Sequence, residues 1–263
     1  DHPYGLRASG EVETLKNLTR EDLLHFYATH YVAERAVVAI MGDVTRSEAE
    51  AIAERLTAGL KRAGREHVQL PEVADLARAV TTNIPHPAAQ AHILIGAPGV
   101  RRGDPDYFAL LVGNHILGGG GFESRLTDEV RSKRGLAYSV YSYFMPLQRR
   151  GSFRIGLQTR GDQAKAAIDV VMQTLRDFVT KGPTAEELED AKGQVKGQLV
   201  ISLESSGARI QRLAGFGLYE EPFLTVEELM ARLDAVTLDD VAGVAAECYD
   251  PDRQVGVRLG PKS

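Results

Sequence analysis

The segment TREDLLHFYATHYVAERAVVAIMG (residues 19–42) is weakly similar to a later segment, TLDDVAGVAAECYDPDRQVGVRLG (residues 237–260). The two segments lie 218 positions apart, and each reads as a capped helix, a turn and a Val- and Ala-rich strand that ends in glycine. The residues identical at this offset include Thr19 and Thr237, Asp22 and Asp240, Tyr31 and Tyr249, Arg35 and Arg253, and Gly42 and Gly260. Further apolar positions keep the same register without a gap, so we interpret the pair as an internal duplication. A chance agreement between two common helix–turn–strand patterns is the alternative.

Capping boxes mark the helix starts along the chain. In a capping box a Thr is followed three residues later by an acid, and each side chain accepts a hydrogen bond from the other residue's backbone N–H. Such boxes begin at Thr19, Thr45, Thr184, Thr225 and Thr237. With hydrophobic periodicity they predict helices over 20–30, 46–62, 105–117, 124–134, 162–180, 185–204, 206–217, 226–234 and 238–248, and strands over 35–42, 90–97, 138–146, 151–159 and 253–259. This mixture without strict alternation predicts an α+β fold of duplicated two-layer units, in which helices cover antiparallel sheets.

The duplication also predicts the domain organisation. A second unit runs over 84–263 and follows a polar linker over 64–83. The same unit placed 218 positions earlier would begin before residue 1. Residues 1–63 are therefore expected to be the C-terminal part of a first, truncated unit.

Composition argues against several classes of function. The 263 residues are 43% hydrophobic and 25% charged, which is typical of a globular protein. A net charge of -5 argues against nucleic acid as the main ligand, and the longest apolar runs are too short for a membrane span. The single cysteine, Cys248, excludes intrachain disulfides and cysteine zinc clusters. None of the seven histidines stands in the His-Glu-x-x-His or His-x-x-Glu-His spacing of zinc peptidases.

The segment LGGGGFESRL (residues 117–126) is the first candidate for function. Its four glycines, Gly118, Gly119, Gly120 and Gly121, let the backbone approach a ligand closely, at an entropic cost. A phosphate loop would need a preceding strand and a following Lys-Ser/Thr pair, which this segment lacks. Two interpretations stay open: a structural turn between helices, and a flexible loop that contacts a peptide backbone.

Arg131 and Tyr138 form the second candidate. Arg131 is predicted near the end of a helix that Gly135 stops, and Tyr138 near the start of the next strand, so the turn can bring the two side chains together. A guanidinium is a rigid fork for carbonyl or carboxylate oxygens, and a Tyr hydroxyl can stabilise a developing oxyanion. The plainer alternative is a cation matched to the helix dipole and a Tyr that packs in the sheet.

Several of these motifs together resemble one family. HPYG (2–5), LTREDL (18–23) and the run from Tyr31 to Asp43 are similar to the later part of a pitrilysin/insulinase-type unit, and Leu117 to Val140 is similar to that family's second unit. This is the inverted-zinc-motif metallopeptidase family that includes mitochondrial processing peptidase and bacterial two-unit zinc proteases. The resemblance covers nearly the whole chain. It implies two homologous α+β units, paired with a partner or a second copy around a peptide chamber.

The resemblance also implies roles for individual residues. Arg131 and Tyr138 match the family's second-unit pair that reaches substrate, with the Tyr as oxyanion donor, and Gly118–Gly121 matches a substrate-contacting segment more weakly. The zinc motif belongs to the front of the first unit, which this chain lacks, and His115 alone falls on a ligand-like position. The chain is therefore expected to bind no metal itself. It would act in polypeptide cleavage only with a zinc-motif-bearing homologous subunit, a second copy of itself or a missing N-terminal half.

Two alternatives come from other classes of protein. The first is a non-catalytic scaffold that resembles the core subunits of respiratory complexes, although a scaffold would need neither Arg131 nor Tyr138. The second is a module that binds peptides without cleaving them. The compartment is open, and a bacterial periplasm or cytoplasm fits the resemblance.

Overall fold

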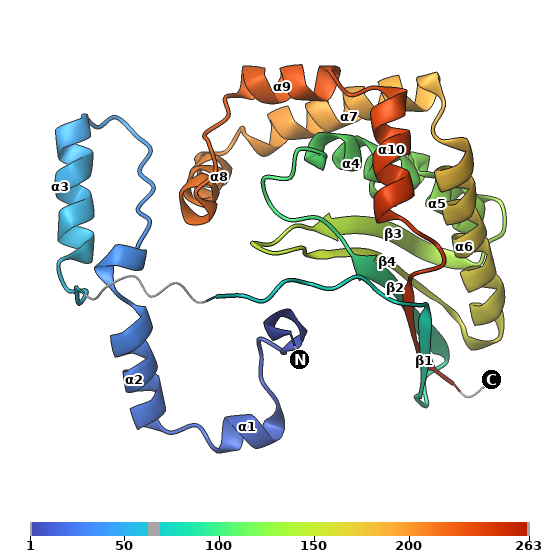
Figure 1. Ribbon diagram of the computed structural model, residues 1–263, viewed down its shortest axis with the longest axis horizontal. Helices are drawn as coiled ribbons and strands as arrows, with labels where there is room; N and C mark the ends of the chain where they lie inside the picture. The colour runs from blue at the N-terminus through green and yellow to red at the C-terminus, as the bar shows by residue number, and fades with distance from the viewer. Residues whose placement is uncertain (1, 63–68, 262–263) are drawn as a thin grey trace. The chain divides into compact units, whose positions relative to one another are not determined.

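The computed structural model describes residues 2–62 and 69–261 (Figure 1). The chain forms two compact units. Unit 1 comprises residues 1–71 and 202–223, and unit 2 comprises residues 72–201 and 224–263. Residues 64–68 of the predicted linker lie outside the described residues.

Unit 2 is built on a five-stranded sheet with the order β1-β5-β2-β4-β3. The strands are β1 (Val80–Pro85), β2 (Gln90–Pro98), β3 (Ala137–Met145), β4 (Ser152–Arg160) and β5 (Val255–Gly260). All neighbouring strands are antiparallel except β1 and β5, which run parallel at one edge. The opposite edge is β3, the strand on which Tyr138 lies.

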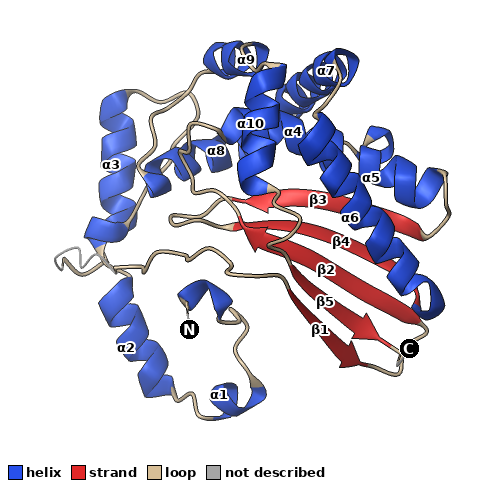
Figure 2. Ribbon diagram, turned by 45° about the vertical axis from the view of Figure 1, so that its right-hand side comes forward, coloured by secondary structure: helices blue, strands red, loops and turns tan. Residues whose placement is uncertain are grey.

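Helices cover one face of this sheet (Figure 2). They are α4 (Tyr107–Asn114), α5 (Arg125–Thr127), α6 (Ala164–Lys181), α7 (Ala185–Ser202), α9 (Val226–Asp234) and α10 (Leu238–Cys248). Alternate residues of β4, such as Phe153 and Ile155, are buried beneath them, as the period of two along a strand requires. Tyr249, which follows α10, is fully buried and meets the rings of Phe153 and Phe178 edge-on. The α+β class and the helix-covered sheet are thus confirmed.

Unit 1 consists of α1 (Val12–Lys16), α2 (Arg20–His30), α3 (Arg46–Thr57) and α8 (Ser206–Tyr219), with short 3₁₀ turns. Among its described residues, Val32 is the only buried side chain. A bridge from Val32 to Lys61 is the only β pairing described in this unit. The strand predicted over 35–42 is therefore wrong: residues 36–41 run without a partner strand, and a strand forms only where neighbours accept its hydrogen bonds.

The capping boxes are confirmed at all five positions. Thr19 and Asp22 exchange hydrogen bonds of 2.9 and 3.2 Å, and Thr237 and Asp240 exchange bonds of 2.8 and 3.1 Å. The boxes at Thr45, Thr184 and Thr225 have the same reciprocal pattern. Helices α2, α9 and α10 accordingly begin and end where predicted.

Two predicted helices change form near the candidate site. The helix expected over 105–117 ends at Asn114 and continues as a π-helical turn, His115–Gly119. The helix expected over 124–134 is α5 followed by a second π-helical turn, Asp128–Ser132.

Strand β1 was not predicted. All six of its residues are exposed, so the strand lacks the alternation of buried and exposed side chains that marks a half-buried strand. None of the described helices combines the length and the apolar character that crossing a bilayer requires.

Candidate functional site

The glycine segment is in large part a packing device. A Cβ atom on Gly118 would lie 2.5 Å from the Ser142 Oγ atom of β3, and one on Gly120 would lie 2.7 Å from the carbonyl oxygen of His115. Glycine at position 118 therefore lets the π-helical turn approach the sheet closely, and glycine at position 120 lets the chain close against His115 of the same turn. Gly121 differs, because its φ of +64° is left-handed and a Cβ there would meet no atom within 4 Å. The structural interpretation holds for Gly118 and Gly120, and Gly121 is the exposed point at which the loop turns.

Hydrogen bonds fix the segment on both sides. Asn114 Nδ2 donates to the carbonyl of Ser142 at 3.1 Å, and Ser142 Oγ donates to Asn114 Oδ1 at 2.7 Å. His115 is buried, with its Nε2 atom 2.7 Å from Gln194 Oε1 of α7. The Gln194 amide in turn donates to Glu123, just after the glycines. The loop is therefore tied to both β3 and α7.

The turn between the second π-helical turn and β3 places Arg131 beside Tyr138. Gly135 has a φ of +60°, and its N–H donates to the carbonyl of Arg131 at 2.9 Å, as expected of a glycine that ends a helix. The N–H of Leu136 donates to the carbonyl of Val130 at 2.9 Å. The chain then enters β3, in which Tyr138 is the second residue.

The Arg131 guanidinium lies over two aromatic rings. Its Cζ atom is 4.3 Å from the ring centroid of Tyr138 and 4.6 Å from that of Phe122. Both rings face solvent, with 81% of Tyr138 and 73% of Phe122 exposed. Within residues 2–62 and 69–261, neither the Arg131 guanidinium nor the Tyr138 hydroxyl has a hydrogen-bond or ion-pair partner. Sequence reasoning anticipated that Arg131 and Tyr138 would meet, and the structure brings them together with their donors free.

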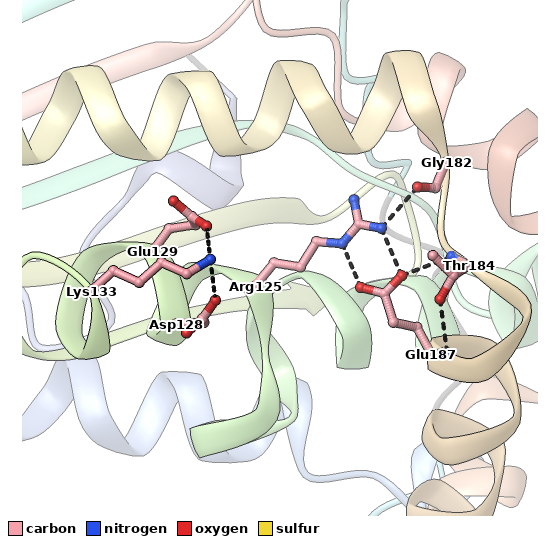
Figure 3. A network of polar contacts seen from close by, with 7 residues as sticks. All are labelled: Arg125, Asp128, Glu129, Lys133, Gly182, Thr184 and Glu187. Carbon is pink, nitrogen blue, oxygen red and sulfur yellow. Dashed lines mark hydrogen bonds and ion pairs between the residues drawn. The ribbon is translucent and has the colours of Figure 1, made fainter.

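The cations nearest to Arg131 in the sequence pair with carboxylates, and Figure 3 shows two of them, Arg125 and Lys133. Arg125 donates to both oxygens of Glu187 at 2.7 Å and to the carbonyl of Gly182 at 2.9 Å. These bonds hold the pKa of Glu187 below its ordinary value. Lys133 bridges Asp128 and Glu129 at 2.8 and 2.6 Å.

Glu129 also pairs with Arg134, and the hydrogen bonds from Lys133 and then Arg134 lower its carboxyl pKa. Arg131 thus differs from the three cations nearest to it in sequence, because rings rather than acids hold it.

Two cavities lie apart from this pair. One, of about 820 Å³, is lined by Arg125, Glu187 and other charged groups that already bind one another. The other, of about 720 Å³, includes Cys248, whose thiol pKa is raised to about 11 chiefly by burial. A thiol with so high a pKa is a poor nucleophile at neutral pH. Neither cavity is lined by Arg131 or Tyr138.

Sequence reasoning missed Phe122. The residue follows the four glycines directly, and a large apolar side chain at the exposed tip of such a loop is itself a signal of contact with something outside the core. Its partner could not be predicted, because the ring reaches Arg131 across nine positions and through two irregular turns.

The residues around His115 do not fit a zinc ion. Within the part of the chain that the structure describes, no group of three His, Cys, Asp or Glu side chains lies close enough to hold a metal. His115 also uses its Nε2 atom to bind Gln194, an amide rather than an acid.

Comparisons with known proteins agree with the motifs. The family described as "Peptidase M16 inactive domain" matches residues 17–195. An uncharacterised zinc protease of Streptomyces coelicolor is 34% identical over 274 residues, which cover 99% of this chain and 58% of the relative. One of Bacillus subtilis is 30% identical over 254 residues, which cover 96% of this chain and 60% of the relative. A probable mitochondrial-processing peptidase subunit beta of Schizosaccharomyces pombe is 29% identical, with 95% and 57% covered.

Solved structures give the same result. The peptidase M16 inactive domain from Pseudomonas fluorescens superposes with a TM-score of 0.91 at 35% identity, covering 98% of this chain and 61% of that one. A chain of Complex III2 from Candida albicans, at 18% identity and a TM-score of 0.79, shares the fold. The chain spans about three fifths of the length of these relatives.

Proposed function

The chain belongs to the peptidase M16 inactive-domain family, and from this membership we propose that Arg131 and Tyr138 serve polypeptide cleavage by binding substrate and stabilising an oxyanion. The observation that carries the proposal is the pairing itself. The Arg131 Cζ atom lies 4.3 Å from the centroid of the Tyr138 ring, Tyr138 is exposed and Arg131 is half-buried. Within the described residues, neither side chain uses its hydrogen-bond donors.

Each side chain has a distinct part in this proposal. The Arg131 guanidinium carries five N–H donors in a rigid fork, so it suits the carbonyl or carboxylate oxygens of a peptide. The Tyr138 hydroxyl is a neutral donor, which can hydrogen-bond the oxyanion as the scissile carbonyl becomes tetrahedral. The exposed Gly121 lets the loop backbone lie near the same peptide. Zinc and its bound water belong, in this proposal, to a homologous subunit or to another region of the protein.

We also propose that, as repeats of one ancestral segment, residues 1–63 are the C-terminal part of a first copy and residues 84–263 are a second copy. This division differs from the compact units above, in which residues 202–223 belong with residues 1–71. The support is local: α2 and α10 lie 218 positions apart and begin on the same Thr–Asp capping box. Such units would pair with a zinc-motif-bearing subunit or a second copy to enclose the polypeptide.

The direct test is Tyr138→Phe, assayed in the assembly that contains the zinc-bearing subunit or region. Loss of an oxyanion donor lowers turnover by ~10²–10³, and we expect little change in KM because the ground-state peptide does not carry the oxyanion. Tyr141→Phe, on the same strand and also exposed, is the matched control and should leave turnover within about twofold of the unaltered assembly.

Unchanged turnover of Tyr138→Phe would remove the catalytic role. Peptide binding without turnover in every mixture of chains would favour the peptide-binding module instead. The absence of both binding and turnover would favour the scaffold.

A further inference from the structure

Arg131 depends on rings for its position. A carboxylate partner, such as Arg125 has in Glu187, would occupy the guanidinium N–H groups. An aromatic ring instead attracts the cation through its π-face and forms no hydrogen bond with the N–H edges. The two rings at 4.3 and 4.6 Å therefore hold Arg131 while leaving its donors available.

The loop that carries Phe122 is firmly anchored although its tip is exposed. Ser124, directly after the 3₁₀ turn Gly121–Glu123, is fully buried, and its hydroxyl donates to the carbonyl of Gly121 at 2.8 Å and contacts Thr127 at 3.1 Å. Glu123 accepts a bond from Gln194. The backbone of Phe122 is thus fixed, while its ring contributes nothing to the hydrophobic core.

We propose that Phe122 is a positioning residue, whose ring holds the Arg131 guanidinium against Tyr138 so that its free N–H groups meet the bound polypeptide. This inference rests on the proposed function of Arg131. The glycine segment would then position the Phe122 ring as well as pack against the sheet, because the anchored loop determines where that ring lies.

The expected effect is on binding rather than on chemistry. An exposed cation–π contact changes an equilibrium constant by about two- to fivefold. Phe122→Ala should raise KM for a cleaved peptide by that factor and leave kcat within error, because Arg131 would hold the peptide equally before and during the reaction. Phe122→Tyr keeps a π-face and should retain the original KM, whereas Phe122→Leu keeps only apolar volume and should behave like Phe122→Ala.

The experiment uses the full assembly and an internally quenched peptide that the unaltered assembly cleaves. Phe223→Ala, which removes another exposed Phe of the chain, is the control for simple loss of surface apolar area and should leave KM and kcat unchanged. A double-mutant cycle with Arg131→Met completes the design. If Phe122 acts through Arg131, Phe122→Ala has no further effect on KM once the charge is gone.

Two results would overturn the inference while leaving the proposed function intact: Phe122→Leu with an unaltered KM, or Phe122→Ala with the same effect in the Arg131→Met background. If Arg131→Met itself leaves KM unchanged, the substrate-binding role of Arg131 and the positioning role of Phe122 fail together. Tyr138→Phe still reports separately on the oxyanion role in that case.

Discussion

Helices α2 and α10 begin on the same capping box and occupy equivalent places in the two repeated segments, yet their surroundings differ. Leu23 of α2 is 62% exposed and its counterpart in α10, Val241, is 0% exposed. Tyr31 and Tyr249, identical at the same offset, are 56% and 0% exposed. The cap and the helix are therefore local products of sequence, whereas burial depends on the sheet that the helix meets.

The strands of the two segments extend the comparison. Residues 255–260 form β5, which pairs with β1 on one side and with β2 on the other. The equivalent residues 37–42 have similar β-branched character but form no ladder within the described residues. Hydrophobic composition makes a segment suitable for a sheet, and neighbouring strands decide whether it joins one.

The largest test of this contrast is truncation of the two tyrosines. Tyr249→Ala removes a ring that meets Phe144, Phe153 and Phe178, and should lower the free energy of unfolding of unit 2 by about 3–5 kcal/mol. Tyr31→Ala should change the free energy of unfolding by less than about 0.5 kcal/mol, because its ring is exposed. Urea unfolding followed by circular dichroism measures both, and equal losses would contradict the contrast.

A smaller effect is expected from the Tyr249 hydroxyl alone. This group is fully buried and, within the described residues, has no hydrogen-bond partner. A buried polar group left unpaired costs about 1–3 kcal/mol, so Tyr249→Phe should raise the free energy of unfolding or leave it unchanged. Thermal unfolding of Tyr249→Phe beside Tyr249→Ala separates the ring from the hydroxyl. A large loss of stability on Tyr249→Phe would reveal a partner for the hydroxyl.

The two caps sharpen the comparison further. Thr237→Ala should destabilise unit 2 by about 1 kcal/mol, because α10 belongs to its core. Thr19→Ala should leave that transition unmoved and instead speed amide hydrogen exchange within α2, a helix of 11 residues that buries none of them. The two measurements together report whether local helix stability is transmitted to a folded core.

The smallest predicted effect concerns pH, and here the two capping boxes should agree. The hydroxyl and the backbone N–H of Thr19 lower the pKa of Asp22 below the ordinary 3.8, and Thr237 does the same for Asp240. A carboxyl with a lowered folded pKa contributes stability above its unfolded pKa and loses it as the pH falls through the folded value. NMR titration should show both carboxyls ionising below pH 3.8, and each Thr→Ala variant should return its own partner toward that value.

The sequence predicted what short-range forces decide. Capping boxes, the ends of α2, α9 and α10, and the meeting of Arg131 with Tyr138 all depend on contacts within about ten positions. Features that depend on contacts between residues far apart in the sequence were not predicted. Strand β1 is held by pairing with β5, 175 positions away, and its own residues carry no alternating pattern. Phe122 was overlooked because the 3₁₀ turn Gly121–Glu123 and the π-helical turn Asp128–Ser132, which no hydrophobic period signals, set its distance from Arg131.

The exposed side chains of residues 2–62 have a practical consequence for handling the polypeptide. Leucines, tyrosines and a phenylalanine that would ordinarily be covered are exposed to water there. The tendency of the protein to aggregate should therefore depend on this stretch rather than on the well-packed unit 2. Salting-out ions should promote aggregation through this stretch first, and a mild detergent should reduce that aggregation without unfolding the core.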